Sequence, residues 1–354
     1  MTESFNEGSE ARDEEALIHG LETTKPTSFW RGKTMKRFRR NPLAITGAII
    51  ILFYILVAVF APQLTVDQLS TFRNTCVRDL GLSRDTVHNI ANPLKGVFWR
   101  SIVAPPQSCF DIPRASYSSV PQPMSGKLWL GASSGGYDIY YGLVWGTRSA
   151  FYVGVLVVGF ALILGGIVGS IAGYIGGFID NVLMRFVDVI FSVPSLIIAI
   201  VIVTILGQSL LNVMIAIMAV QWAPYSRILR GDIMAIKERD FVDGARALGA
   251  RGPRVVGRHI LPNSIGPLLV IASLDIGSVV LVAAALSFLG LGAPVGYADW
   301  GQMINFARDW IQGPPGQPFA YWYVSFWPGI IIVIFVLGWN LLGDAARDVL
   351  DVRS

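Results

Sequence analysis

The chain has 354 residues, of which 53% are hydrophobic and only 15% are charged, and its mean hydropathy is +0.54. Soluble domains carry nearer ~25% charged residues, so this composition excludes an ordinary soluble protein and favours a chain that lies largely in a bilayer. The net charge of +4 comes from basic clusters. Apolar runs of about 20 residues separate these clusters, which argues against nucleic-acid binding and for contact with membrane lipid.

The first 41 residues are predicted to form a cytoplasmic tail. Residues 1–28 are acidic and polar and lack the charged-then-apolar pattern of a cleaved signal peptide. Residues 31–40 contain six basic side chains directly before the first apolar run. A basic segment in that position is typical of the cytoplasmic membrane surface.

Six apolar runs predict an all-α integral membrane protein with six transmembrane helices, at residues 43–62, 149–174, 185–206, 210–225, 265–289 and 322–342. Pro42 stands where the first helix can start, and Pro194 interrupts the third run. The expected organisation is a tail (1–41), a first transmembrane helix (42–62), an extended extracytoplasmic loop (63–147), a transmembrane core (148–345) that includes a cytoplasmic loop (226–263), and a C-terminal tail (346–354).

Basic residues predict the orientation. The segment before the first span and the loop 226–263 are strongly basic, whereas residues 290–321 contain one basic side chain, Arg308. The positive-inside rule therefore places the N and C termini and the loop 226–263 in the cytoplasm of a multi-pass protein of the cell (inner or cytoplasmic) membrane. The seven basic residues of 63–147 do not alter this, because loops longer than ~60 residues cross largely regardless of charge.

Four glycines recur at successive i+4 positions along the second span: Gly165, Gly169, Gly173 and Gly177. They fall on one helix face and predict a groove for close helix contact. Packing within this chain is favoured over packing against a moving neighbour.

Two aspartates lie within predicted spans. Asp275 is deep in the fifth span, where a charge is costly and marks a functional candidate by default. It could line a pathway and meet a cationic group, be hydrogen-bonded to another helix, or be protonated. Asp188 lies one turn after Arg185 near the inner end of the third span, which favours a local ion pair.

Both cysteines of the chain, Cys76 and Cys109, lie in the long loop 63–147. The loop is predicted to be on the outer side of the membrane, where oxidation is permitted. We therefore predict a disulfide bond between them rather than two free thiols.

The loop 226–263 is too long for a simple turn and has a helical pattern of its own. Residues 243–250 (DGARALGA) combine small residues with good helix formers. Gly249 can end this helix and Pro253 can begin the next. Both a docking element and an amphipathic helix on the membrane surface fit this pattern. Three small side chains would let another protein approach closely, namely Gly244, Ala245 and Ala247.

These motifs resemble one family. DGARALG (243–249), followed nine residues later by HILP (259–262), resembles the EAA loop of ABC importer permeases, with Asp243 in place of Glu and Gly244 in place of Ala. The glycine weakens the helix by ~1 kcal/mol. Four further segments resemble the second permease subunit of dipeptide, oligopeptide and nickel importers, namely 130–150, 173–196, 286–303 and 340–351.

The resemblance implies the type I ABC importer permease architecture and four kinds of partner: a homologous permease subunit, two ATP-binding cassette ATPase subunits, an extracytoplasmic substrate-binding protein and membrane lipid. The implied substrate is a di- or oligopeptide, with nickel complexes and oligosaccharides open in the same family. Asp243 is implied to pair with a basic residue of the ATPase, whereas Arg246, Arg251 and Arg254 could equally face water or lipid headgroups. The implied ATPase-coupling residues are Asp243, Gly244, Ala245, Arg246, Ala247, Leu248, Gly249, His259 and Pro262.

No cofactor or catalytic residue is expected in this chain. The three histidines (His19, His88 and His259) are scattered and indicate no metal site. The single Gly-Lys-Thr, at 32–34, is not a phosphate-binding loop because Thr27 stands where the first glycine is needed. ATP and Mg are thus expected on partner ATPases. An ion- or proton-coupled transporter, with Asp275 as its coupling charge, and an intramembrane enzyme are the alternative classes.

Overall fold

The computed structural model describes residues 41–350 apart from 73–74, 116 and 251. The predicted tail therefore lies outside the described residues except for Asn41, as do residues 351–354. The described part of the chain is helical, and its β-structure is limited to isolated bridges. The elements in chain order are α3 (Pro42–Val59), α4 (Ala61–Leu64), α5 (Val66–Thr71), α6 (Thr75–Asp79), η2 (Arg84–Ala91), α7 (Gly96–Val103), η3 (Gln107–Phe110), α8 (Ile139–Ile175), α9 (Gly177–Phe191), α10 (Ser195–Leu206), α11 (Leu210–Lys237), α12 (Asp240–Ala247), α13 (Gly252–Val255), η4 (Val256–Ile260), α14 (Leu261–Phe288), α15 (Trp300–Ala307), η5 (Arg308–Trp310) and α16 (Trp322–Leu350).

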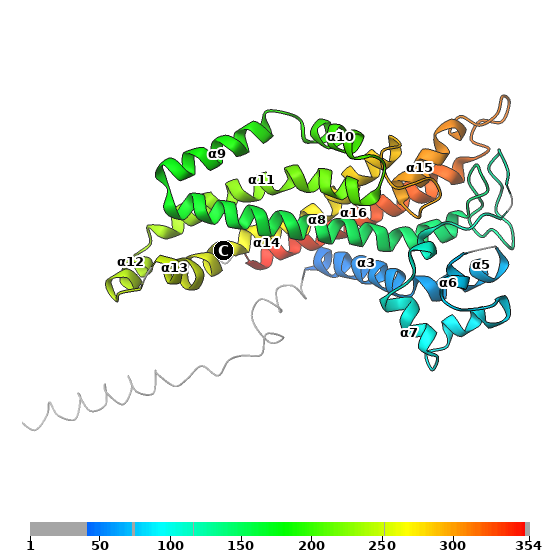
Figure 1. Ribbon diagram of the computed structural model, residues 1–354, viewed down its shortest axis with the longest axis horizontal. Coiled ribbons are helices and arrows are strands. Elements are labelled where there is room, and N and C mark those ends of the chain that lie inside the picture. The colour runs from blue at the N-terminus through cyan, green and yellow to red at the C-terminus, as the bar shows by residue number, and fades with distance from the viewer. Residues whose placement is uncertain (1–40, 73–74, 116, 251, 351–354) are drawn as a thin grey trace, which may run out of the picture.

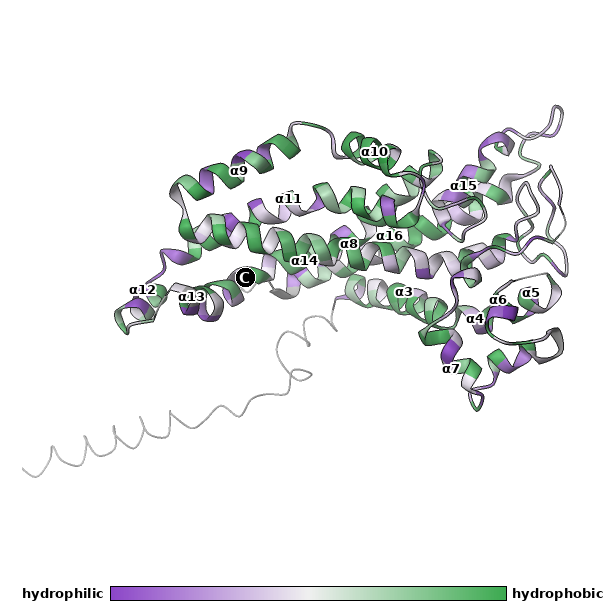
Figure 2. Ribbon diagram, in the orientation of Figure 1, coloured by the Kyte–Doolittle hydropathy of each residue, from purple (hydrophilic) through white to green (hydrophobic). Residues whose placement is uncertain are grey.

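Figure 1 shows an elongated bundle in which α8, α11, α14 and α16 run along the long axis. Helix α3 packs against α16, and α9 and α10 lie along one side of the bundle. The short helices α12 and α13 project at one end, whereas α5, α6, α7 and α15 gather at the opposite end (Figure 1). Apolar residues dominate the long helices and polar residues concentrate toward the two ends (Figure 2), as expected for helices that cross a bilayer.

Four helices in the described residues are long and apolar enough to cross a membrane, and the number is five if α9 and α10 form one broken span. The four are Pro42–Val59, Ile139–Ile175, Val256–Phe288 and Trp322–Asp348, and the axes of α9 and α10 differ by 83°. The prediction of a helical membrane protein is thus confirmed. Helix α11 is not among these candidates, since it carries several polar and charged residues, and the count of six remains a prediction.

Several helices extend beyond the predicted boundaries. Helix α8 begins at Ile139, inside the predicted loop 63–147. Helix α11 continues to Lys237, inside the predicted loop 226–263, and α16 continues to Leu350, beyond the predicted end of the core at 345. The hydrophobic pattern detects only the apolar part of a helix, whereas hydrogen bonding continues into polar turns that leave the bilayer.

Two aspartates, the buried Asp138 and the half-buried Asp299, start helices near the same end of the bundle. The Asp138 carboxylate accepts a hydrogen bond from the Tyr141 N–H at 2.9 Å and caps α8. Asp299 caps α15 by accepting from the Gly301 N–H. Burial raises the pKa of Asp138 to about 6 and also raises the pKa of Asp299, because an apolar environment disfavours the charged form.

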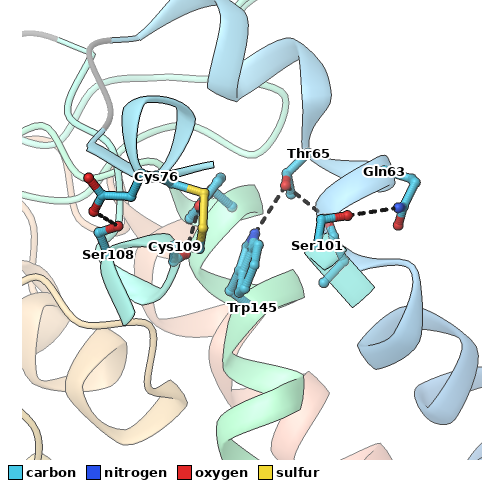
Figure 3. The surroundings of a disulfide bond; sticks show 10 residues. Gln63, Thr65, Cys76, Ser101, Ser108, Cys109 and Trp145 are labelled. Atoms are coloured by element: carbon cyan, nitrogen blue, oxygen red, sulfur yellow. Dashed lines mark hydrogen bonds between the residues drawn. A yellow bond between two sulfur atoms is a disulfide. The ribbon is translucent and has the colours of Figure 1, made fainter. Parts of the chain in front are cut away.

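The predicted extended loop is instead a folded unit over residues 61–110, which we call the disulfide cap. It contains α4 to α7, η2 and η3, and its apolar side chains are buried together with those of the start of α8. Cys76 and Cys109 form the predicted disulfide, with Cα atoms 4.5 Å apart (Figure 3). The Trp145 indole N–H donates to the Thr65 hydroxyl at 3.0 Å and joins the cap to α8 (Figure 3).

Helices α8 and α11 approach most closely along the glycines of α8. A Cβ atom on Gly165 would lie 2.5 Å from the Cβ of Tyr225, and one on Gly169 would lie 2.5 Å from the Ser226 carbonyl oxygen. One on Gly173 would lie 2.9 Å from the Arg230 carbonyl oxygen. Internal packing is thus confirmed for three of the four glycines, which form the α8–α11 seam; Gly177 instead begins α9 with open space around it.

We predict that Gly169→Ala destabilises the protein by about 1–3 kcal/mol, because the new methyl group forces two backbones apart. Gly159→Ala is the matched control on the same helix, because a Cβ atom at Gly159 would meet no atom within 4 Å. Thermal unfolding of the purified protein in detergent, followed by the loss of soluble protein after heating, measures both. Equal midpoints for the two variants would contradict the close packing of the seam.

Candidate functional site

The predicted docking element is a helical projection at the end of the bundle opposite the disulfide cap (Figure 1). Helix α11 leads directly into it, and α12 occupies Asp240–Ala247. A short α13 and the π-helical turn η4 then return the chain to α14. The projection, residues 238–260, is thus connected at both ends to long helices of the bundle without an intervening flexible linker.

Helix α12 has one buried and one exposed face. Val242 is fully buried and belongs to the core cluster of α8, α11 and α14. Phe241 is 44% exposed and Leu248 is 91% exposed, and open space surrounds Gly244. A helix that buries one apolar position and presents two large apolar side chains has the surface that a protein partner can cover.

Charged residues of α12 pair within the helix. The Arg246 Nη1 donates to Asp243 Oδ1 at 3.1 Å, and both side chains are well exposed. An exposed pair at i,i+3 contributes little to stability. The local pair therefore does little to hold the Asp243 side chain in place.

Gly249 ends α12 as predicted. Its φ angle is +85°, a conformation that favours glycine. The Gly249 N–H donates to the Arg246 carbonyl, and the Ala250 N–H donates to the Ala245 carbonyl at 3.1 Å. These two bonds satisfy carbonyl groups at the helix end and reverse the chain toward α13.

The projection is held against the end of α8 through Tyr174. The Lys237 ammonium donates to the Tyr174 carbonyl at 2.7 Å and lies 5.5 Å from the centre of its ring. Gly252 packs so closely that a Cβ there would lie 2.8 Å from the Tyr174 hydroxyl oxygen. This contact was not identified from the sequence. Lys237 and Tyr174 are 63 positions apart, and a pattern within one helix cannot indicate a contact between residues so far apart.

His259 and Pro262 lie at the junction with α14. The His259 carbonyl accepts from the Asn263 side chain, and Pro262 occupies the first turn of α14, directly after the π-helical turn η4. His259 lies in η4, ten residues beyond Gly249 in the chain. These two residues therefore lie where the chain returns to the bundle and not on the exposed face of α12.

Two arginines of α11 bind aspartates of α9. Arg230 binds Asp180 through both carboxylate oxygens, with Nη2 and Oδ2 2.6 Å apart, and the Asp180 side chain is only 10% exposed. Arg227 binds Asp188 in an exposed pair. The predicted pair of Asp188 with Arg185 is wrong, because the bound partner comes from the neighbouring helix and not from the preceding turn of α9.

Asp275 on α14 is hydrogen-bonded to α11. Its Oδ2 accepts from Gln221 Nε2 and from the Tyr225 hydroxyl, both at 2.9 Å, and its Oδ1 accepts from the Ser278 hydroxyl at 3.2 Å. Of the alternatives open for Asp275, hydrogen bonding to another helix is therefore observed. Gln221 stands out in the sequence as a polar residue in an apolar run, but nothing in the sequence indicates that it contacts Asp275.

We predict that Asp180→Asn lowers stability by roughly 1–3 kcal/mol, because the substitution leaves the half-buried Arg230 without a charged partner. Asp188→Asn is the matched control, and its half-exposed pair should cost under about 1 kcal/mol. The measurement is the thermal midpoint of each purified variant. A larger loss for Asp188→Asn would contradict the difference in burial between the two pairs.

Comparison with known proteins gives the following matches. The family described as "Binding-protein-dependent transport system inner membrane component" matches residues 165–354, and the "N-terminal TM domain of oligopeptide transport permease C" matches residues 28–75. A dipeptide transport system permease protein of Alkalihalophilus pseudofirmus is 38% identical over 92% of this chain and 90% of its own length. An oligopeptide transport system permease protein of Bacillus subtilis is 31% identical over 93% of this chain and 91% of its own length.

Solved structures give a weaker match. A structure titled as an inward facing conformation of the MetNI methionine ABC transporter is 20% identical, with a TM-score of 0.49, and the match covers 60% of this chain and 97% of that one.

Proposed function

Because the chain belongs to the family of binding-protein-dependent transport inner membrane components, we propose that its projection couples ATP hydrolysis by partner subunits to transport. The chain is a permease subunit of an ATP-binding cassette importer. A homologous permease would complete the pathway, and two ATPases would bind ATP and Mg on the inner face. A binding protein would deliver substrate on the outer face.

One observation carries the coupling proposal, namely the exposed helix α12 between two helices of the bundle. Phe241 and Leu248 are exposed where a partner can bury them, and Asp243 can exchange its weak local pair for an intermolecular one. Because Lys237 and Gly252 fix the projection to α8, a force on α12 would move the bundle rather than bend a loop. Of the residues that sequence reasoning assigned to coupling, Asp243 to Ala247 lie on α12, Leu248 and Gly249 follow it directly, and His259 and Pro262 lie farther along the chain in η4 and α14.

We propose six crossings with both termini in the cytoplasm. Asn41, which caps α3, donates to the Asp348 carboxylate near the end of α16 at 3.1 Å. The two ends of the described chain therefore meet at one end of the bundle, and this supports an even number of crossings. Counting α9 with α10 as one span and α11 as another gives six, and the basic loops then favour the cytoplasm for this end.

We propose that Asp275 lies beside the transport pathway. Its carboxylate is held by two α11 side chains, Gln221 and Tyr225, so a relative movement of α11 and α14 would change its hydrogen bonding. The proposed substrates are di- or oligopeptides, by analogy with the names of the two relatives, and a peptide has an amine that a carboxylate can bind. Because hydrogen bonds to α11 account for a carboxylate at this depth, a coupling ion is not needed to explain the presence of Asp275.

We predict that Gly249→Pro abolishes substrate-stimulated ATPase activity and transport in the assembled importer. Proline cannot adopt the φ angle of +85° found at Gly249, so the end of α12 must change shape. Gly316→Pro is the matched control, because Gly316 has a φ angle of +83° and open space but lies in the loop between η5 and α16. Purification of the complex with its ATPases verifies that each variant still assembles.

Unchanged transport by an intact Gly249→Pro complex would rule out coupling through α12. Failure of this chain to purify with any ATPase would rule out the importer assembly itself. Equal loss of transport in Gly316→Pro would show that backbone strain at a glycine abolishes transport wherever the glycine lies, and would contradict a specific role for α12.

We predict that a membrane-impermeant maleimide added to intact cells labels Tyr117→Cys, on the disulfide-cap side, but not Leu248→Cys. Both positions are exposed, at 82% and 91%, and the two native cysteines are joined in a disulfide, so background labelling should be low. Permeabilised cells should show labelling of both variants. Labelling of Leu248→Cys in intact cells would reverse the proposed orientation.

A further inference from the structure

An open groove of about 400 Å³ lies where the end of α3 meets α8 and α7. Its walls are mostly apolar, and one charged side chain, Arg148 of α8, stands among them. The proposed transport mechanism does not use this groove, which lies near the disulfide cap and far along α8 from the projection.

Arg148 is only partly satisfied. Its Nε donates to the Ala58 carbonyl, and its Nη2 donates to the carbonyl groups of Val59 and Ile102, each at 3.0 Å. A guanidinium has five N–H donors, so the two on Nη1 lack a protein acceptor in the part of the chain that the structure describes. The Arg148 guanidinium also lies over the uncharged ring of Trp145, 5.3 Å from its centre, and no carboxylate there forms a salt bridge with Arg148. An arginine with free N–H donors and no acidic partner can bind a phosphate group.

The depth of the groove matches the headgroup layer of a bilayer. Helix α3 has 18 residues, which at ~1.5 Å per residue gives about 27 Å, close to the thickness of the hydrocarbon region. Arg148 contacts the last residues of α3 and is therefore at the membrane surface. Tyr152, Val155 and Leu156 follow on α8 toward the membrane interior, and all three are exposed by 40% or more.

Helix α7 provides an independent indication of a lipid surface beside the groove. It buries Phe98 and Ser101 but exposes Trp99 by 60% and Val103 by 79%. Trp residues favour the membrane–water interface. The exposed basic residues Lys95 and Arg100 suit the same layer because they can reach lipid phosphates, and Ile102 of α7 lines the groove.

We propose that this groove binds an anionic phospholipid of the leaflet on the disulfide-cap side. Arg148 donates from Nη1 to the phosphate oxygens, and an acyl chain lies along Phe151, Val155 and Leu156. Arg148 then contacts the end of α3, the end of α7 and the lipid headgroup. The lipid stabilises the junction between the disulfide cap and the membrane helices.

The test is native mass spectrometry of the purified importer complex after addition of phosphatidylglycerol or, separately, phosphatidylcholine. Leu156→Trp fills the groove without removing the backbone contacts of Arg148, and Arg148→Gln removes the charge. Ile167→Trp is the matched control, because Ile167 is 53% exposed and lies eleven residues, about 16 Å, farther along α8.

The wild-type complex and Ile167→Trp should retain phosphatidylglycerol in preference to phosphatidylcholine. Leu156→Trp and Arg148→Gln should retain about tenfold less phosphatidylglycerol, equivalent to ~1.4 kcal/mol. Three results would overturn the proposal: undiminished retention by Leu156→Trp, equal retention of the two lipids by the wild type, or loss of the second permease from the Leu156→Trp complex. The last result would make the groove a subunit interface.

Discussion

The close contact between α8 and α11 is the constraint on which the rest of the bundle depends. At Gly165, Gly169 and Gly173 a single methyl group would collide with the opposite helix. The two helices can pack at this distance only because glycine has no side chain. Inside a bilayer the lipid tails are as apolar as the helices, and close van der Waals packing drives helix association instead of exclusion from water. The seam therefore fixes α11, and α11 positions both the projection and the partners of Asp275.

Helix α11 is joined both to Asp275 and to the projection, the two features to which we assign a role in the proposed mechanism. It holds Asp275 through Gln221 and Tyr225, it binds α9 through Arg227 and Arg230, and it leads into α12. Its charged residues weaken it as an apolar span, but two of them join it to α9. A rigid element with contacts on several neighbours is the physical requirement for transmitting a displacement between distant sites.

The two ends of the bundle are built by different means. At the projection end, exposed pairs such as Asp243–Arg246 contribute little stability and leave charges available for a partner. At the opposite end, a disulfide and buried hydrogen bonds to Thr65 and Cys109 make the cap a fixed part of the fold. A disulfide that restricts the unfolded chain suits a long segment with a small apolar core.

The sequence by itself determined the membrane class, the apolar parts of the helices, the close-packing face of α8 and the cysteine pairing. Each of these depends on local composition or on a pattern within one segment. Only the tertiary structure decided that Asp188 binds Arg227 and not Arg185, that Asp275 is held by α11, and that residues 61–110 fold into a cap. Those outcomes depend on which helices lie side by side, and no periodicity within a single helix records its neighbours.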